Sequence, residues 1–239
     1  MQYVVQSEQE FYNLAGSLQG GDVVAFAAGQ YDTMTFKKLK FFREGKITSL
    51  RPKKPAVFLD KTTIQKSSNL TFENLSFELH TVTSTSSSAY NALLYLTKSS
   101  DINILNNNIQ GVVSTTGQDP NAVTNPSAEI IGYATGSGIS LNNVQGVTIS
   151  GNDMHDLGFG GSLNDTQDTL ISGNHIHDIR TDGIRGTDQI NTVIESNLFE
   201  NFHPWYGPNT TIGDHADMIQ YWGSGGSFGI DGFVVKDNI

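Results

Sequence analysis

Short runs in which apolar and polar residues alternate recur along the second half of the chain, and each run leads into an asparagine. This alternation has the two-residue period that is typical of β-strands. Three runs are closely alike: VTISGNDMHD at 147–156, TLISGNHIHD at 169–178 and TVIESNLFEN at 192–201. Their asparagines, Asn152, Asn174 and Asn197, lie 22 and 23 residues apart. A repeat of this length, built from short strands and Gly/Asn turns, predicts a β-solenoid.

An aliphatic residue marks the first strand of each predicted coil. Leu94, Ile139 and Ile184 each lie 13 residues before the asparagine of their coil. Ile219 begins a further coil, whose Asn238 comes six residues late because GSGGSFGIDG lengthens the connection. We therefore predict three strands per coil of about 22 residues, and regular coils over about 92–239 of a single domain, 1–239.

The two ends of the chain differ in pattern. Ser7 and Glu10 form a capping-box signature, and Phe11, Leu14 and Leu18 follow at helical spacing. A short helix over about 7–19, ended by Gly20-Gly21, is expected to cover the N-terminal end of the solenoid. The last residues, VVKDNI, contain no polar capping segment. We expect the C-terminal end to be truncated or uncapped.

Charge is distributed unevenly along the chain. Residues 1–66 hold ten Lys/Arg and six Asp/Glu, whereas 67–239 hold four Lys/Arg and eighteen Asp/Glu, a net charge of −14. Such a surface repels nucleic acid, and it repels an acidic polysaccharide unless an arginine or a cation such as Ca²⁺ intervenes. No apolar run is long enough to span a membrane, and MQYVVQSEQE has no signal-peptide pattern. The chain has no cysteine, so no disulfide supports the fold.

Connections of two lengths leave the same corner of the predicted coil. From the asparagine to the next aliphatic strand takes 9 or 10 residues after Asn152 and Asn174, but 32 after Asn107 and 22 after Asn197. Long loops at about 111–136 and 203–216 therefore stand three coils apart, or roughly 14 Å at the usual strand spacing. We expect them to form the two walls of a groove whose floor is the strand of Ile139, Ile184 and Ile219.

Alternation on the floor strand predicts which side chains face the groove. If Ile184 points inward, Arg185 and, one coil later, Gln220 point outward. Asp182 and Asp217 occupy matching positions at the starts of their strands. The guanidinium of Arg185 or Arg180 is suited to binding a carboxylate in two places at once. Alternatively, Asp182–Arg180 or Asp217–Arg185 is a purely structural ion pair.

The strand after each asparagine carries a second set of candidates. His155, His177 and Glu200 should form one outward column, and Asp156, Asp178 and Asn201 the adjacent one. Stacked Asp and His side chains can hold a metal ion or share a proton, or they can be an ordinary solvent-facing ladder. The repeated asparagines themselves are expected to be structural, each bonding backbone groups at the turn.

The segment HPWYGPNTTIGDHAD at 203–217 concentrates aromatic and titratable residues. It contains His203, Trp205, Tyr206, Asp214 and His215, and Trp222 follows it. Aromatic faces beside carboxylates and imidazoles suit a sugar-binding site, and Tyr and His are plausible acid/base groups. The alternative is an ordered loop whose aromatic rings pack on the solenoid.

The asparagine ladder, the capping helix and the entry segments GGDVVAFAAGQY and SSNLTFENLSF resemble the right-handed parallel β-helix family of polysaccharide lyases and mannuronan C5-epimerases. The resemblance implies an all-β, right-handed, single-stranded parallel β-helix. It also implies proton abstraction from a uronate, with Arg185 as carboxylate binder, His215 or His203 as base and Tyr206 or Tyr221 as proton donor. Asp214-His215-Ala216-Asp217 partly matches the DPH[ED] motif of the epimerases but lacks its proline.

The remaining roles in this prediction are substrate binding and metal binding. Substrate-binding candidates are Arg180, Gln220, Trp205, Trp222 and His177, and candidate Ca²⁺ ligands are Asp182, Asp217 and Asp178. The predicted partner is an acidic polysaccharide, with no nucleic acid and no membrane, and the predicted location is extracellular or secreted.

Three readings of function stay open from sequence. The first is a monomeric lyase or epimerase. The second is a non-enzymatic glycan-binding β-helix of a phage tail or adhesin, expected to be a homotrimer. The third is a purely structural solenoid.

Overall fold

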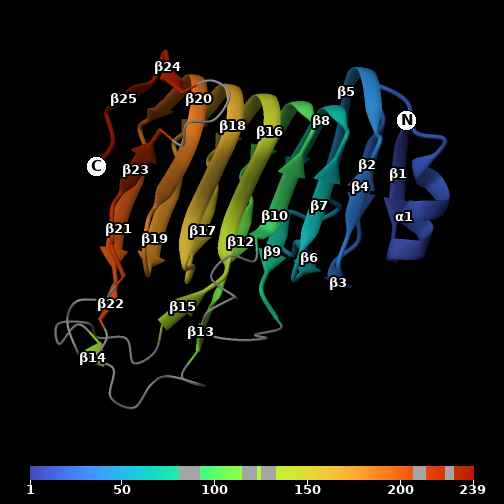
Figure 1. The fold of residues 1–239 in the computed structure, drawn as a ribbon. Coiled ribbons are helices and arrows are strands. Elements are labelled where there is room, and N and C mark those ends of the chain that lie inside the picture. The colour runs from blue at the N-terminus through green and yellow to red at the C-terminus, as the bar shows by residue number, and fades with distance from the viewer. Residues whose placement is uncertain (81–91, 115–122, 125–132, 207–213, 224–228) are drawn as a thin grey trace.

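The computed structural model describes residues 1–80, 92–114, 123–124, 133–206, 214–223 and 229–239. These residues form a parallel β-helix whose coils stack along one axis (Figure 1). They contain one α-helix, α1 (Glu8–Ala15), and none of their helices is long and apolar enough to cross a membrane. The all-β solenoid expected from the alternating pattern is confirmed.

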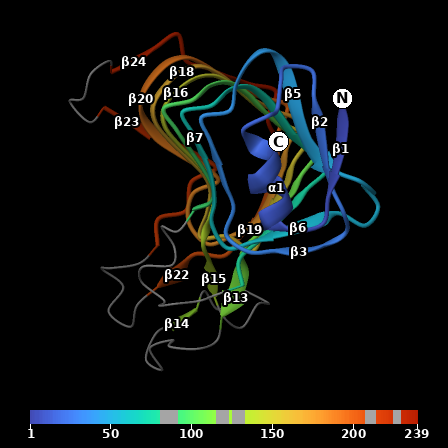
Figure 2. The same ribbon diagram turned by 90° about the vertical axis from the view of Figure 1, so that its right-hand side faces the viewer.

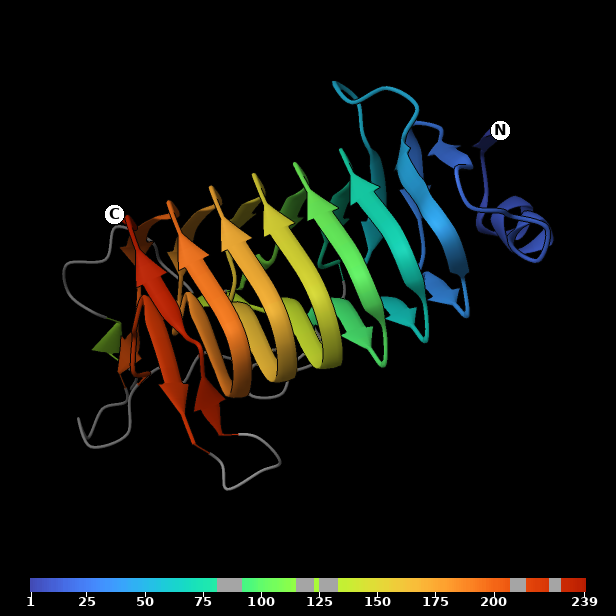
Figure 3. The ribbon, with the colours of Figure 1, turned by 90° about the horizontal axis from the view of Figure 1, so that it is seen from above.

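Two long sheets wrap the coil, and successive coils place their strands side by side (Figure 3). The 14-stranded sheet contains β1 (Gln2–Val5), β2 (Val23–Phe26), β4 (Thr35–Lys37), β5 (Lys40–Ser49), β7 (Thr62–Gln65), β8 (Ser68–Glu73), β10 (Ala92–Thr97), β11 (Ser100–Leu105), β16 (Ser137–Ser150), β18 (Phe159–Ser172), β20 (Ile184–Glu195), β23 (Ile219–Trp222), β24 (Ile230–Asp231) and β25 (Val234–Lys236). The seven-stranded sheet contains β3 (Gly29–Tyr31), β6 (Ala56–Leu59), β9 (Ser76–Glu78), β12 (Asn108–Gln110), β17 (Asp153–His155), β19 (His175–Ile179) and β21 (Leu198–Phe202).

The register between coils agrees with the sequence pattern. Leu94 pairs with Ile139, Ile139 with Gly161, Gly161 with Ile184, and Ile184 with Ile219. All of these pairings are parallel. The outward neighbours of these residues therefore also form a row, as predicted for Arg185 and Gln220.

The core is made of stacked apolar columns that run through the coils. One aliphatic column is Ile104, Ile149, Ile171 and Ile194, all at most 2% exposed. The N-terminal coils use aromatic rings instead, with Phe36 packed on Phe72 at a centroid distance of 4.9 Å. Burial of such columns between successive coils is the main source of stability in a solenoid.

Helix α1 covers the N-terminal end of this core (Figure 2). Its N-cap hydroxyl, on Ser7, accepts a hydrogen bond from the backbone N–H of Glu10, and Phe11 is buried against the first coils. The helix is shorter than the predicted 7–19: it ends at Ala15 with Gly16 as its C-cap, before Gly20-Gly21 is reached.

The long connections meet each other, which corrects the expected two-walled groove. In the first loop, β13 (Val112–Ser114) pairs with β15 (Tyr133–Thr135). Its short strand β14 (Val123–Thr124) pairs with β22 (Trp205–Tyr206) of the second loop (Figure 1). The loops are thus joined by backbone hydrogen bonding rather than standing 14 Å apart. The rest of the predicted loops, 115–122, 125–132 and 207–213, lies outside the described residues.

Candidate functional site

Two clusters of polar side chains flank the corner from which these loops leave. One lies at the start of β20 and β23 and is called here the Arg185 cluster: Asp182, Arg185, His215, Asp217, Gln220 and Trp222. The other lies on β17, β19 and β21 and is called here the histidine ladder: Asp153, His155, Asp156, His175, His177, Asp178, Glu200 and His203.

Arg185 is the centre of the first cluster. Its guanidinium carbon lies 4.5 Å from the centroid of the Phe159 ring and 4.9 Å from that of Trp222. Its Nη1 lies 3.4 Å from Oδ2 of Asp182, and 23% of its side chain is exposed. Two aromatic faces therefore hold a planar cation at the surface with some of its N–H donors available.

Asp182 is the buried acid of this cluster, with 2% of the residue exposed. Burial raises the pKa of its carboxyl group, and the nearby Arg185 opposes that shift. Oδ1 of Asp182 also accepts a hydrogen bond of 3.3 Å from the backbone N–H of Asp217. The two matching aspartates predicted from the sequence are thus brought into direct contact across neighbouring coils.

His215 and Asp217 form an exposed imidazole–carboxylate pair. Nδ1 of His215 lies 2.7 Å from Oδ2 of Asp217, and 78% of the His215 side chain is exposed. The amide nitrogen of Gln220 lies 3.5 Å from the same Nδ1. A carboxylate on one ring nitrogen orients the imidazole and leaves Nε2 for proton transfer. One carboxylate oxygen each of Asp182 and Asp217 and one nitrogen of His215 lie within 4.8 Å of one another.

The arginines do not form the structural pairs that the sequence suggested as alternatives. Arg180 pairs with Asp214, Nε to Oδ2 at 2.9 Å, and both side chains are largely buried. Arg185 pairs with Asp182 instead of Asp217. Arg180, predicted to bind substrate, and Asp214, predicted to be catalytic, therefore anchor the loop to the coil.

Tyr221 is removed from the set of proton donors. It pairs with Gly186 in the register, one position beyond the outward Gln220, so alternation points its side chain inward. Its ring lies 4.5 Å from that of Phe233, and its hydroxyl is buried without a hydrogen-bond partner among the described residues. Burial raises the pKa of this hydroxyl far above its ordinary range. The side chains of Trp205 and Tyr206 lie outside the described residues.

The histidine ladder alternates imidazoles and carboxylates across three coils. His177 and Asp178 are joined at 2.6 Å, and His203 bonds the other oxygen of Asp178 at 3.1 Å. His155 and Asp156 repeat the first relationship one coil earlier, at 2.9 Å. Asp156 and Asp178 adopt positive φ angles of 56° and 53°, which break strand alternation and bring each carboxylate beside the preceding imidazole.

The ladder contains three of the predicted site residues and places them apart from Arg185 in the hydrogen-bond pattern. His177 was predicted to bind substrate, Asp178 to bind metal with Asp182 and Asp217, and His203 to act as base. Asp178 instead bonds His177 and His203. The sequence analysis missed Asp153 and His175, although both precede a predicted outward histidine by two residues and so share its face.

A hollow elsewhere on the molecule lacks comparable chemistry. It lies at another corner of the coil, where Ser67, Ser99 and Val144 lie in successive coils, and Lys40 and Lys98 line it. Its lining offers hydroxyl, amide and ammonium groups and one carboxylate, Asp165, but no imidazole. We therefore place the candidate site at the loop-bearing corner.

The described geometry defines a class, the parallel β-helix. The chain belongs to the right-handed β-helix family: the model described as "Right handed beta helix region" matches residues 92–213, slightly more than half of the 239 residues. None of the curated protein sequences matches this chain.

Solved structures show the same fold. An alginate lyase from Paenibacillus sp. str. FPU-7 is similar with a TM-score of 0.54 and 15% identity, over 99% of this chain and 65% of that one. A mannuronic acid specific polysaccharide family 6 lyase from human gut microbiota has a TM-score of 0.52 and 16% identity, over 83% of this chain and 48% of that one. This chain spans less than two thirds of the length of either protein. The predicted resemblance to polysaccharide lyases is confirmed at the level of architecture.

Proposed function

We propose that the protein acts on a uronate-containing polysaccharide by abstracting the proton next to the carboxylate, as a β-elimination lyase or a C5-epimerase. The observation that carries this proposal is Arg185, held between Phe159 and Trp222 beside the His215–Asp217 pair. A cation for the substrate carboxylate and an oriented base are the two groups that this chemistry needs.

A row of outward side chains supports a polymeric substrate. Tyr95 pairs with Ser140, Ser140 with Ser162, Ser162 with Arg185, and Arg185 with Gln220. The row crosses five coils at about 4.8 Å each and offers hydroxyl, guanidinium and amide groups in line. Trp222 lies next to it with 39% exposure, which suits stacking on a sugar face.

The residues take the following roles in this proposal. Arg185 binds the uronate carboxylate and offsets the charge that develops there when the proton leaves. Nε2 of His215 takes the proton from C5, while Asp217 holds the ring at Nδ1 and stabilises the imidazolium. In a lyase the electron pair then forms the C4–C5 double bond, and the bond from C4 to the leaving oxygen breaks as that oxygen is protonated. In an epimerase C5 is reprotonated on its other face, and Tyr206 remains the proposed donor.

Calcium is proposed only as an auxiliary ligand of this site. Ca²⁺ prefers six to eight oxygen ligands, whereas the cluster offers the carboxylates of Asp182 and Asp217 with an imidazole nitrogen. The donor set fits calcium only when substrate and water oxygens complete it. Bound there, calcium would add positive charge next to the substrate carboxylate, and no step above depends on it.

The test is a screen of alginate, polymannuronate and polygalacturonate, each with Ca²⁺ and with a chelator. Near-ultraviolet absorbance detects the unsaturated product, and NMR detects an epimerised sugar. Product from wild type, lost in both Arg185→Ala and His215→Ala with the fold intact, is the expected result. Binding without product would favour a glycan-binding module instead, with a trimer in light scattering as its further mark. Full activity in both variants would overturn the site assignment.

The same proposal bears on location. Structural polysaccharides of this class lie outside the cell, so we propose that the protein acts there, in the secreted or surface-associated fraction. Fractionation of the producing cell, with an antibody against the protein, checks this directly.

A further inference from the structure

We propose that Asp153, His175 and His177 of the histidine ladder form a binding site for a divalent transition metal of the Zn²⁺ type. The site is on the seven-stranded sheet and is separate from the Arg185 cluster. It does not depend on the proposed polysaccharide chemistry. His175 and His177 come from β19 and Asp153 from β17, one coil earlier.

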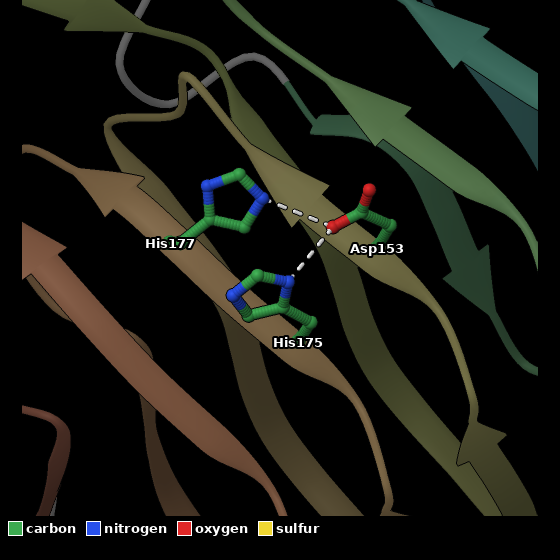
Figure 4. A group of neighbouring side chains, drawn as sticks. All are labelled: Asp153, His175 and His177. Atoms are coloured by element: carbon green, nitrogen blue, oxygen red, sulfur yellow. Dashed lines mark hydrogen bonds and ion pairs between the residues drawn. The ribbon is translucent and has the colours of Figure 1, made fainter.

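The three ligand atoms converge in the geometry that such an ion requires. Nε2 of His177 lies 3.0 Å from Oδ1 of Asp153, and Nδ1 of His175 lies 3.6 Å from the same oxygen. Figure 4 shows both rings directing a nitrogen toward this oxygen. A tetrahedral zinc ion with ligands at about 2.0–2.2 Å places neighbouring ligand atoms about 3.4 Å apart. The site thus needs only small side-chain movements to accept the ion.

The outer nitrogen of each imidazole is held by a second carboxylate. Nδ1 of His177 bonds Oδ2 of Asp178 at 2.6 Å, and Nε2 of His175 bonds Oε1 of Glu200 at 2.7 Å. Such an arrangement fixes the tautomer that presents a free lone pair to the ion and raises the basicity of the ligand. It is the outer shell expected of metal-ligating histidines, and here it is present on both of them.

The donor chemistry indicates which metal. Two imidazole nitrogens and one carboxylate suit Zn²⁺, Co²⁺, Ni²⁺ or Cu²⁺ and are poor ligands for Ca²⁺ or Mg²⁺. Three protein ligands leave a further coordination position for water or an exogenous donor. The side chain of His177 is 19% exposed and that of Asp153 is 52% exposed, so the position is reachable from solvent.

The experiment titrates metal-free protein with Zn²⁺ and, separately, Ca²⁺ in a calorimeter. Co²⁺ titration followed by visible absorption reports the coordination geometry. We expect one Zn²⁺ per chain at this site, and a loss of affinity of about 100-fold or more in Asp153→Asn, His175→Ala and His177→Ala. Glu200→Gln, which removes only an outer carboxylate, should weaken binding about 10–100-fold. Circular dichroism confirms that each variant is folded.

Two histidine variants serve as matched controls. His80→Ala removes an exposed imidazole outside both clusters, and His215→Ala removes one from the Arg185 cluster; both should keep wild-type affinity. Unchanged Zn²⁺ binding in Asp153→Asn and His177→Ala would overturn the proposal. Loss of binding in His215→Ala alone would place the ion at the other cluster, and absence of Zn²⁺ binding by wild type would exclude the site.

Discussion

Oδ1 of Asn174 accepts two hydrogen bonds of 2.9 Å from Asn152, one from its backbone N–H and one from Nδ2. Asn197 repeats the relationship with Asn174, and Nδ2 of Asn174 also donates to the carbonyl of Ile149. These asparagines are buried. The ladder therefore satisfies polar backbone groups at a corner that water does not reach.

Asn174→Ala should lower the free energy of unfolding by at least about 2 kcal/mol, because it leaves the backbone N–H of Asn152 and the carbonyl of Ile149 without partners in a buried site. Urea denaturation measures the change. Asn164→Ala is the control, since the Asn164 side chain is only partly buried and accepts one long bond of 3.3 Å from Thr187. An equal effect of the two substitutions would contradict the structural role of the ladder.

Replacing Arg185 should separate charge from shape. Arg185→Lys keeps the positive charge but loses the planar fork and its aromatic stacking, so we expect kcat/KM on the uronate polymer to fall at least tenfold. Arg185→Ala should cost more, because the substrate carboxylate then has no counter-charge at the row. Steady-state kinetics give both values. Arg51→Ala, at an exposed turn, should leave them unchanged; equal kinetics for Arg185→Lys and wild type would exclude a bidentate role.

Asp217→Asn tests the oriented base. The substitution keeps the size of the side chain but removes the carboxylate that holds Nδ1 of His215. We expect kcat to fall by about 10²-fold or more, approaching the loss in His215→Ala, because the two residues act as one unit. If Asp217→Asn retains full kcat while His215→Ala does not, the imidazole is oriented by another group.

The His155–Asp156 pair predicts a pH-dependent contribution to stability. The hydrogen bond to Asp156 raises the pKa of His155, and the same bond lowers the pKa of Asp156. The raised histidine stabilises the fold below its unfolded pKa and loses that effect as pH rises through its folded pKa; the lowered aspartate loses its effect as pH falls through its folded pKa. The pair therefore contributes most between about pH 4 and pH 6.5.

His155→Gln should accordingly destabilise the protein more at pH 5.5 than at pH 9. Urea unfolding of both proteins at each pH gives the two differences. His80→Gln, at an exposed position outside the ladder, is the control for handling a histidine variant. A His155→Gln difference that is the same at both pH values would show that the pair contributes packing rather than charge.

Tyr221→Phe tests the correction made to the proton donor. The hydroxyl has no partner among the described residues, so its removal should leave the free energy of unfolding unchanged or raise it by about 1 kcal/mol. Turnover should stay at the wild-type level. A loss of activity without loss of stability would return Tyr221 to the reaction.

The sequence by itself determined the coil, its register and the inward or outward direction of most side chains. Those properties depend on local periods: alternation assigns faces to Ile184 and Arg185, and the spacing of Asn152, Asn174 and Asn197 aligns one coil with the next. Because each coil contacts only its neighbours, the repeat length is enough to predict which residues pair.

Only the tertiary structure decided which polar groups meet. Asp182 pairs with Arg185, and Arg180 with Asp214, because the loop after β21 returns to the coil at a place that no repeat specifies. The paired strands β14 and β22 likewise join two loops separated by 80 residues of chain. Asp178 is divided from Asp182 by a left-handed turn and a corner, which a reading of spacing alone cannot place. Irregular connections carry no period, so their contacts follow from packing in three dimensions.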